Sequence, residues 1–568
     1  MEMGQDGGAG DWPIGDPSSI HNEIIKHHQE GTLVYCRYGA SYVQNLEKQT
    51  SMISNLPVSN KCASYLINVK KLIRDHNIES NEHNLFKMKT QNNISKQQTT
   101  GNKEADHFRT ENPNKPYESS TEQAEGTISF ESRFESGNLL AAMKLGQEEY
   151  NLILQNDINT NGHTQWYFFR TINHLKGQKI RFNVLNLAKS DSLYNYGMKV
   201  LAFSTKKSEA ESIGWHRVGT NIGYFPNAVK KDPNMRNSKC YYTFTFTYEF
   251  EFDSDQVYFA HCFPYTYSDL TDDLSKIEKN PYTSTFFVRN TLCRTLAGNK
   301  CEYLTITSKS NTTEEMAAKK GVFISARVHP GESNASWMMK GVIEFLVSDA
   351  PEARILRDQF VFKILPMINP DGVINGNYRC SLAGSDLNRR YKNPSKVLYP
   401  VIYNLKRFVK NFSKERELML FCDLHGHSRK KSIFMYGNNI PEAPESSRLF
   451  PYIMSKLCDF FSFEDCRFSM HKSKEATARI AIYREVPISN IFTMEASFSG
   501  ADHGEKKGKH FTTEDLMAAG RNLLEAILVY SKVNVQENFK RLCAKPDENK
   551  KSQKDSQSSN SRKGSESS

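Results

Sequence analysis

The sequence lacks any apolar run that could cross a membrane. A membrane-spanning helix needs about 18 or more consecutive apolar residues, and no stretch of the 568-residue chain approaches that length. The opening residues, MEMGQDGGAGDWPIGD, are acidic and glycine-rich, and they have no apolar core of the kind found in a signal peptide. We therefore expect a protein with no membrane association.

Cysteine pairs and strong charge are also missing. The 11 cysteines are irregularly spaced and form no Cys-x-x-Cys pair, which is typical of reduced thiols in a cytoplasmic protein. The formal net charge is only +10, from 74 basic and 64 acidic residues, and no nucleic-acid-binding motif accompanies it. These features disfavour a disulfide-stabilised secreted protein, and we expect no nucleic acid as a partner.

Changes of composition divide the chain into four parts. The first is rich in Asn, Gln, Lys and Glu, with a short helical pattern at 63–78. The second contains aromatic and β-branched runs with period-two alternation, such as KIRFNVLNL and YYTFTFTYEFEF, which predict an antiparallel β-sandwich. The predicted parts are a largely low-complexity or disordered extension (1–127), the sandwich (128–268), an α/β domain (269–537) and a disordered Ser/Lys-rich tail (538–568).

The third part alternates buried strands with helices. Four runs are continuously apolar, as in strands covered on both faces: GVFISARV, FVFKILPMI, LMLFCDL and NIFTMEASF. Helical patterns occupy 336–348, 397–412 and 514–533. Together they predict an α/β fold with a mixed, mostly parallel central sheet flanked by helices.

Three His-x-x-Glu pairs offer imidazole and carboxylate groups, which both suit Zn²⁺. The pairs that begin at His27 and His76 lie in the polar extension with no strand before them, so we interpret them as ordinary solvated residues. The third pair, His329 and Glu332, directly follows the strand GVFISARV. Catalytic groups of open α/β sheets gather at such strand ends, so this pair is the candidate for a zinc site.

A hydrolytic zinc site needs a third protein ligand and an open position for water. The strand LMLFCDL leads into His425 and His427, and either imidazole could serve as that ligand. His425 comes first after the strand and is the better candidate. His427 is then expected behind the ligands or in the wall of the pocket.

Glu495 lies inside the otherwise apolar strand NIFTMEASF. An unpaired carboxylate is costly to bury, so this one needs a partner or a function. Burial would raise its pKa and suit a general base that takes a proton from water. The alternative is a buried ion pair with Arg479 or Arg484.

Between the candidate ligands lies NPDGVINGNYRCSLAGSDLNRRY, a loop-rich stretch that carries Arg379, Asn388 and Arg389. Arginine matches a carboxylate with two parallel hydrogen bonds. A cleft with zinc, a base and these donors would hold a carboxylate and hydrolyse the amide bond near it. Any one of these arginines alone would more simply be a surface residue in a turn.

These motifs together resemble the zinc metallocarboxypeptidases, and more closely their cytosolic, tubulin-deglutamylating branch. The similar segments are HPGES at 329–333, NPDGV to DLNRR at 369–390, DLHGHS at 423–428 and FTMEAS at 492–497. FESRFESGNLLAA, HTQWYFF, SLYNYGM and GWHRVG are similar to the β-sandwich that precedes the peptidase domain in that branch. The resemblance covers about residues 128–535.

The resemblance implies one zinc ion per catalytic domain. Its ligands would be His329, Glu332 and His425, and Asp386 would be the acidic residue that orients a ligand histidine.

The resemblance also implies how the substrate is held and cleaved. Glu495 would be the general base, and Arg379 would polarise the scissile carbonyl. Asn388 and Arg389 would bind the substrate's terminal carboxylate.

The pocket for the last substrate side chain is expected near SKEATARIAIYRE, just upstream of Glu495. Family members that remove acidic residues are expected to place a basic side chain there. Arg479 is our choice, with Lys474 and Arg484 as the other candidates. An ion pair of Arg479 with a neighbouring surface glutamate is the alternative.

The resulting hypothesis is a zinc metallocarboxypeptidase that removes C-terminal glutamates from polyglutamylated or acidic tails such as those of tubulin. Microtubules are expected partners, and the cytoplasm, cytoskeleton, cilium or basal body the expected location. One alternative is a zinc amidase or deacylase for small acylated amino acids, and another is a microtubule-binding module with a vestigial site.

The net positive charge lies mainly in the part of the chain that is predicted to fold. The segment 1–127 carries 13 basic and 16 acidic residues, and 540–568 carries 8 and 4, so the remaining 128–539 holds a net charge of +9. Charge on the folded body favours steering of an acidic peptide into a cleft.

Overall fold

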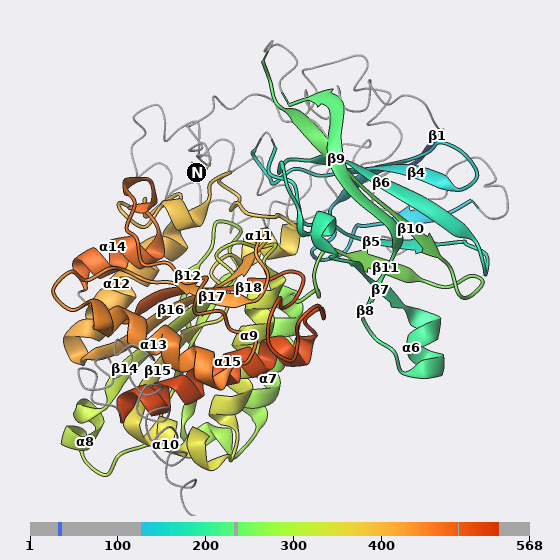
Figure 1. Ribbon diagram of the computed structural model, residues 1–568. Coiled ribbons are helices and arrows are strands. Elements are labelled where there is room, and N and C mark those ends of the chain that lie inside the picture. The colour runs from blue at the N-terminus through green and yellow to red at the C-terminus, as the bar shows by residue number, and fades with distance from the viewer. Residues whose placement is uncertain (1–31, 37–126, 161, 232–236, 487, 533–568) are drawn as a thin grey trace, which may run out of the picture.

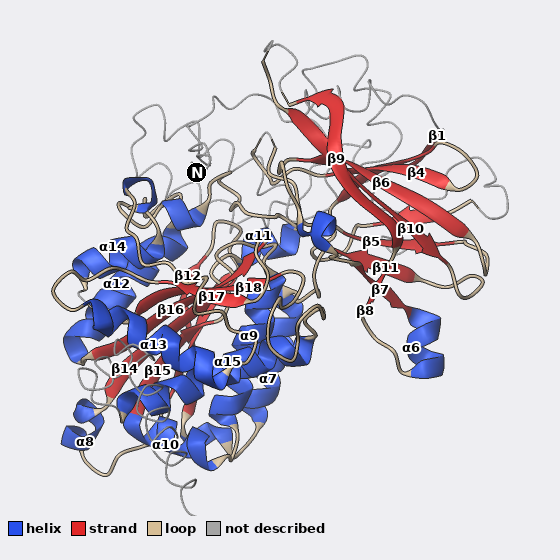
Figure 2. Cartoon of the chain, viewed as in Figure 1, coloured by secondary structure: helices blue, strands red, loops and turns tan. Residues whose placement is uncertain are grey.

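The computed structural model describes residues 32–36, 127–160, 162–231, 237–486 and 488–532. They form a β-sandwich beside a sheet covered by helices (Figure 1), and colouring by secondary structure separates the two domains clearly (Figure 2). The helical pattern at 63–78, the His-x-x-Glu pairs of the extension and the C-terminal tail lie outside the described residues. No helix within the described ranges is long and apolar enough to span a bilayer.

The sandwich consists of two sheets whose inner faces form an aromatic core. One sheet has the order β1 (Thr32–Cys36), β3 (Leu139–Lys144), β4 (Glu149–Leu154), β6 (Lys179–Leu187), β10 (Cys240–Glu249) and β9 (Thr220–Lys230). The other has the order β2 (Ser129–Glu131), β5 (Phe168–Ile172), β11 (Val257–Ala260), β7 (Val200–Ser204) and β8 (His216–Val218). A 3-10 turn, η2 (Leu193–Tyr196), and a short helix, α6 (Thr205–Glu211), join strands.

The predicted sandwich is confirmed, with two features that the sequence pattern did not indicate. Neighbouring strands are antiparallel except β4 and β6, which run parallel. Strand β1 comes from the N-terminal extension and pairs with the edge strand β3. It covers backbone groups that would otherwise be exposed on the edge of the sheet.

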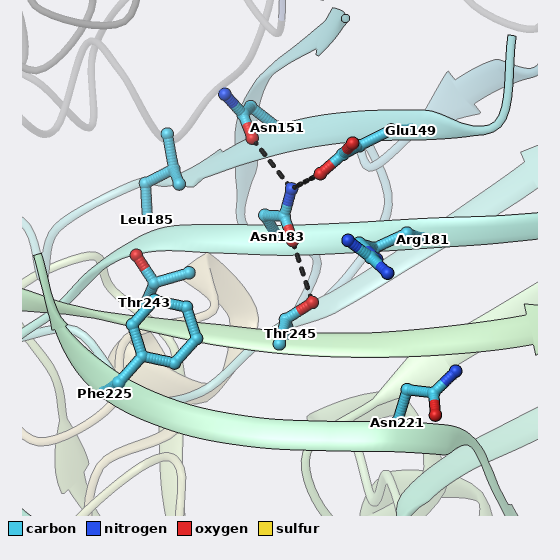
Figure 3. A pocket seen from close by; sticks show the side chains of 9 residues that line it. All are labelled: Glu149, Asn151, Arg181, Asn183, Leu185, Asn221, Phe225, Thr243 and Thr245. Carbon is cyan, nitrogen blue, oxygen red and sulfur yellow. Dashed lines mark hydrogen bonds between the residues drawn. The ribbon is translucent and has the colours of Figure 1, made fainter. Parts of the chain in front are cut away.

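Period-two alternation explains why one face of the six-stranded sheet can stay exposed. Along β6, Ile180 and Phe182 are buried, whereas Asn183 points outward. Figure 3 shows Asn183 at the centre of a polar ladder, where it donates to Glu149 (2.8 Å) and Asn151 (3.1 Å) and accepts from the Thr245 hydroxyl (2.8 Å). These polar groups satisfy one another, so the face needs no covering layer.

The second domain is built on a seven-stranded mixed sheet. Its order is β12 (Phe287–Arg294), β13 (Lys300–Ile306), β15 (Phe360–Leu365), β14 (Lys320–Ala326), β16 (Leu418–His427), β18 (Ile491–Ser497) and β17 (Ile433–Tyr436). The four strands from β15 to β18 are parallel, and antiparallel strands flank them on both sides. The predicted α/β fold with a mixed sheet is confirmed.

Helices cover both faces of this sheet. One face packs on α12 (Pro400–Glu415) and α14 (Ala478–Glu485), and the other on α9 (Ser333–Val347), α13 (Pro444–Leu457) and α15 (Thr513–Ser531). The remaining elements are α7 (Tyr267–Lys279), η3 (Thr283–Thr285), α8 (Thr313–Ala318), α10 (Pro351–Gln359), α11 (Pro370–Asn375), η4 (Leu387–Arg389) and η5 (Lys472–Lys474). The predicted helices correspond to α9, α12 and α15, with ends within a few residues.

Candidate active site

Two neighbouring parallel strands, β16 and β18, change from apolar to polar side chains toward their carboxyl ends. Successive side chains of a strand point to opposite faces, so Phe421, Asp423 and His425 share the face of β16 that packs toward α12 and α14. His425 lies directly beside Glu495 of β18 in the register of the sheet. The apolar face therefore ends in a histidine and a carboxylate on adjacent strands.

The loop after β14 brings two more polar groups to this point. Arg327 adopts a left-handed backbone conformation (φ 58°), and its guanidinium donates to the carbonyl of Pro330 at 2.9 and 2.7 Å and to that of Tyr265 at 2.9 Å. These bonds fix the tight turn that contains His329. Glu332 stands at the N-terminus of α9, immediately after the turn.

The structure brings His329, Glu332 and His425 into one buried cluster. The Glu332 carboxylate lies 2.7 Å from Nδ1 of His329 and 2.9 Å from Nδ1 of His425. One ligand atom from each residue lies within 4.8 Å of the others, and the residues are 3, 5 and 2% exposed. Two imidazole nitrogens and a carboxylate oxygen, with a fourth position left for water, are a donor set that fits Zn²⁺.

A carboxylate lies behind each imidazole. Asp386 lies 3.1 Å from Nε2 of His329, and Asp423 lies 2.7 Å from Nε2 of His425. Such contacts fix the tautomer and the ring orientation, so that Nδ1 faces the metal position.

The electrostatics of the cluster are set by these charges. Burial raises the pKa of Glu332, but the charges of His329 and His425 outweigh it and hold that pKa well below its ordinary value. Burial lowers the pKa of His425, but Asp423 and Glu332 outweigh it and hold that pKa well above its ordinary value. The acidic surroundings therefore favour a positive charge at this point, and a metal cation would take the place of the proton.

Glu495 faces the same cluster. Burial raises its pKa to about 7, and the nearby charge of Glu332 adds to the rise while that of His425 opposes it. Within the described part of the chain its carboxylate has no ion pair, because Arg484 binds Glu475 (2.9 Å) and Arg479 donates elsewhere. The alternative of a buried ion pair with either arginine is therefore not observed.

The loop between α11 and η4 carries the candidate substrate-binding groups. The guanidinium of Arg379 binds Asp386 through two nitrogens, at 2.8 and 2.7 Å. The same carboxylate accepts the amide of Asn388 at 2.8 Å and lies 3.9 Å from the guanidinium of Arg389. The Asn388 side chain also accepts the amide of Ala478 at 2.9 Å, which ties the loop to α14.

Arg479 lies on α14 and is only 8% exposed. It donates to the carbonyl of Gly437, to the Asn438 side chain (2.7 Å) and to the carbonyl of Ser469 (3.4 Å). Burial lowers its pKa to about 10. No carboxylate of the described residues pairs with it, so the alternative of a surface ion pair for Arg479 is not observed.

Comparison with known proteins decides the family. Residues 282–460 match the family model of zinc carboxypeptidases, and residues 130–262 match that of the cytosolic carboxypeptidase N-terminal domain. The chain is 47% identical over 412 residues to cytosolic carboxypeptidase 2 of Xenopus tropicalis, covering 72% of this chain and 42% of that protein. It is 43% identical over 420 residues to cytosolic carboxypeptidase 3 of Bos taurus, covering 73% of this chain and 41% of that protein. The chain belongs to the cytosolic carboxypeptidases.

Two further comparisons concern the length of the relatives and their fold. The chain spans about half or less of the length of the curated relatives it matches, for example 56% of cytosolic carboxypeptidase 2 of Danio rerio. A solved metallo-carboxypeptidase from Burkholderia cenocepacia shares 23% identity with a TM-score of 0.58, over 71% of this chain and 99% of that one. One from Pseudomonas aeruginosa shares 22% identity with a TM-score of 0.56 over the same proportions. These structures show the same fold.

Sequence reasoning missed some residues at the site. Asp423 stands two residues before His425, and that spacing places both side chains on one face of a strand. The sequence alone therefore contained a signal for Asp423. Lys189 comes from the sandwich, and its amine lies 2.6 Å from the hydroxyl of Ser428 and 5.0 Å from the ring centre of Tyr378. No local pattern indicates that contact, because it joins residues far apart in the sequence.

The position of His427 agrees with its expected place outside the ligand set. Its Nδ1 accepts the backbone amide of Lys430 at 2.9 Å, and its ring lies 5.2 Å from that of Phe434. Burial lowers its pKa to about 4. The histidine therefore shapes the turn after β16.

Proposed function

We propose that the chain is a zinc-dependent carboxypeptidase that removes C-terminal glutamates from acidic or polyglutamylated protein tails, such as those of tubulin. The observation that carries the proposal is the juxtaposition of three zinc-type ligands with Glu495, a carboxylate that forms no ion pair with any described residue. The groups expected to bind a terminal carboxylate stand on a loop attached to the same cluster.

His329, Glu332 and His425 would hold the zinc ion. Bound Zn²⁺ supplies Lewis-acid polarisation of the scissile carbonyl and a lower pKa for water. The substrate's terminal carboxylate binds the side-chain amide of Asn388 and the guanidinium of Arg389, and this contact sets the position of the last peptide bond.

Glu495 carries out the proton transfer. The attacking water forms the new carbon–oxygen bond at the scissile carbonyl and gives its proton to the Glu495 carboxylate. Arg379 donates hydrogen bonds to the carbonyl oxygen as negative charge develops there. Glu495 then gives the proton to the departing nitrogen as the carbon–nitrogen bond breaks.

The preference for glutamate rests on Arg479. A buried guanidinium without an anionic partner is costly, and an acidic substrate side chain would supply that partner. The net charge of +9 on residues 128–539 would attract acidic tails to the cleft. Microtubules are therefore proposed partners. The names of the relatives support a cytoplasmic location, and the cytoskeleton, cilium and basal body belong to the proposal.

Tubulin-tail peptides that end in Glu, Gln, Leu or Tyr provide the test, with products identified by mass spectrometry. The wild-type chain should release Glu fastest. Glu495→Gln should retain its zinc content and lose about 10²-fold or more in kcat. Near-normal turnover by that variant would contradict the assigned mechanism.

Arg479→Gln tests the side-chain pocket against a matched control on the same helix. It should lower kcat/KM for Glu-ended peptides by about 10-fold or more relative to Leu-ended ones. Arg484→Gln removes only a surface pair with Glu475 and should leave the preference unchanged. Cleavage of N-acyl amino acids instead of peptides would favour the amidase alternative, and microtubule binding without turnover would favour a binding module.

A further inference from the structure

One loop of the sandwich reaches into the catalytic domain. Asp157, between β4 and β5, is only 2% exposed. One oxygen of its carboxylate accepts the backbone amide of Tyr378 at 2.5 Å. The other accepts the amides of Arg379 and Cys380, both at 2.7 Å. Three successive amides of the loop that carries Arg379 thus converge on one side chain from another domain.

The neighbours of Asp157 fasten the same loop. The amide of Ile158 donates to the side chain of Asn377 at 3.3 Å, and the side chain of Asn159 donates to the carbonyl of Leu382 at 2.7 Å. Gly384 has a φ of 66°, and a Cβ there would stand 2.3 Å from the carbonyl oxygen of Asn159. The two backbones are therefore in close contact along the loop.

Two carboxylates hold Arg379 at its two ends. Asp386 binds the guanidinium, while Asp157 binds the backbone amide. Asp386 also contacts His329, so a change there would disturb a metal ligand as well. The hydrogen bonds of the Asp157 carboxylate go to the loop backbone and not to the metal-binding side chains.

A carboxylate suits this position because it only accepts hydrogen bonds when ionised. An asparagine would keep one acceptor oxygen and would turn an NH₂ donor toward backbone amides that are donors themselves. Buried amides left without an acceptor are costly, so the loop would shift to find other partners.

We propose that Asp157 is a positioning residue, through which the sandwich domain holds Arg379 at the scissile carbonyl. The inference rests on the proposed carboxypeptidase function. It makes the sandwich part of the active site, because a shift of the loop by a fraction of an ångström misplaces the guanidinium.

The expected kinetic signature follows from the role of Arg379. A donor to the developing oxyanion acts mainly in the transition state, so its misplacement lowers kcat more than it raises KM. Losing one such donor outright costs about 10²- to 10³-fold in kcat. For Asp157→Asn we expect kcat to fall about 10- to 100-fold, KM to change less than about 3-fold and zinc content to stay that of the wild type.

Two control variants separate positioning from general stability. Asp255 is an equally buried sandwich carboxylate that accepts backbone amides of Lys206 and Gln256, at 3.0 and 2.7 Å. Ser136 donates from its hydroxyl to the carbonyl of Val373 at 2.7 Å, across the same domain boundary. Asp255→Asn should lower the unfolding temperature, and both Asp255→Asn and Ser136→Gly should leave kcat unchanged.

A double-mutant cycle tests whether Asp157 acts through Arg379. Arg379→Gln removes the group that is being positioned, so adding Asp157→Asn should lower kcat by no more than about 3-fold further. Independent effects would multiply, and a further 10-fold loss or more in the double variant would overturn the inference.

A second variant decides the question if Asp157→Asn does not fold. Asn159→Gly removes the bond to Leu382 at a residue whose φ of 59° glycine adopts freely. It should lower kcat with little change in KM, and this loss should also vanish in the Arg379→Gln background. Folded variants with wild-type kcat would overturn the inference alone, whereas an inactive wild-type chain would overturn the proposed function and the inference with it.

Discussion

Asp423 offers the sharpest test of how the protein prepares the proposed zinc site. It is fully buried, accepts the hydroxyl of Ser325 at 2.7 Å and lies 2.7 Å from Nε2 of His425. Asp423→Asn keeps the shape of the side chain and removes its charge. The variant therefore changes the basicity of His425 while the sheet around it stays intact.

The magnitude follows from what the charge does. A carboxylate behind a ligand histidine raises the basicity of the imidazole and fixes its ring, and its loss typically costs about 10- to 100-fold in metal affinity. That range corresponds to about 1.4 to 2.7 kcal/mol of binding free energy. We expect the Asn variant toward the upper end, because no other anion contacts Nε2 of His425 among the described residues.

Zinc affinity measured by competition with a chromophoric chelator at neutral pH gives the result directly. Asp515→Asn is a suitable control, since Asp515 is a buried carboxylate that caps the distant helix α15 through Thr512. The control should lower the unfolding temperature and keep zinc affinity. Equal zinc affinity in the wild type and Asp423→Asn would refute the role given to Asp423.

Three further outcomes are expected. Gly520→Ala should destabilise the fold by about 1–3 kcal/mol in urea unfolding, because its Cβ would stand 2.0 Å from the carbonyl oxygen of Met338 in α9. Gly146→Ala should leave the stability unchanged, because no atom of the described residues lies within 4 Å of the added Cβ. Equal effects of the two substitutions would contradict the reasoning. Burial lowers the pKa of His261 from 6.5 to about 3. As the pH falls from 6.5 toward 3, the unfolded chain binds a proton at this histidine and the folded chain does not, so the unfolding temperature should fall across that range. His261→Gln should make the unfolding temperature less dependent on pH in this range, and an unchanged dependence would contradict the role given to His261. Rising ionic strength should increase KM for acidic peptides more than for neutral ones, and equal responses would exclude charge steering.

The elements that sequence reasoning located best are those with strong periodicity. The apolar runs correspond to β14, β15, β16 and β18, because a strand covered on both faces has few ways to satisfy its backbone other than in a sheet. Strand β1 and the parallel pairing of β4 with β6 were not predicted. Both depend on which edge a distant strand meets, and local composition does not encode that.

The site shows the same contrast between residues that local sequence patterns locate and residues that they do not locate. His329 and Glu332 follow a predicted strand, and His425 and Glu495 lie in the last part of two others, so topology gathers them at one edge of the sheet. Asp157 could not be found in this way. Its contact with Arg379 joins residues 222 positions apart, and its own surroundings, QNDIN, read as an ordinary polar turn.

The two histidines proposed as zinc ligands depend on different parts of the molecule. The support of His425 passes through Asp423 to Ser325 and ends within the central sheet. The support of His329 passes through Asp386 to Arg379, whose backbone is held by Asp157 of the sandwich. Because that second path crosses a domain boundary, disturbance of the sandwich should reach Arg379 first, and His425 lies outside this path. The sandwich is thus joined to the candidate active site by the contacts that hold Arg379.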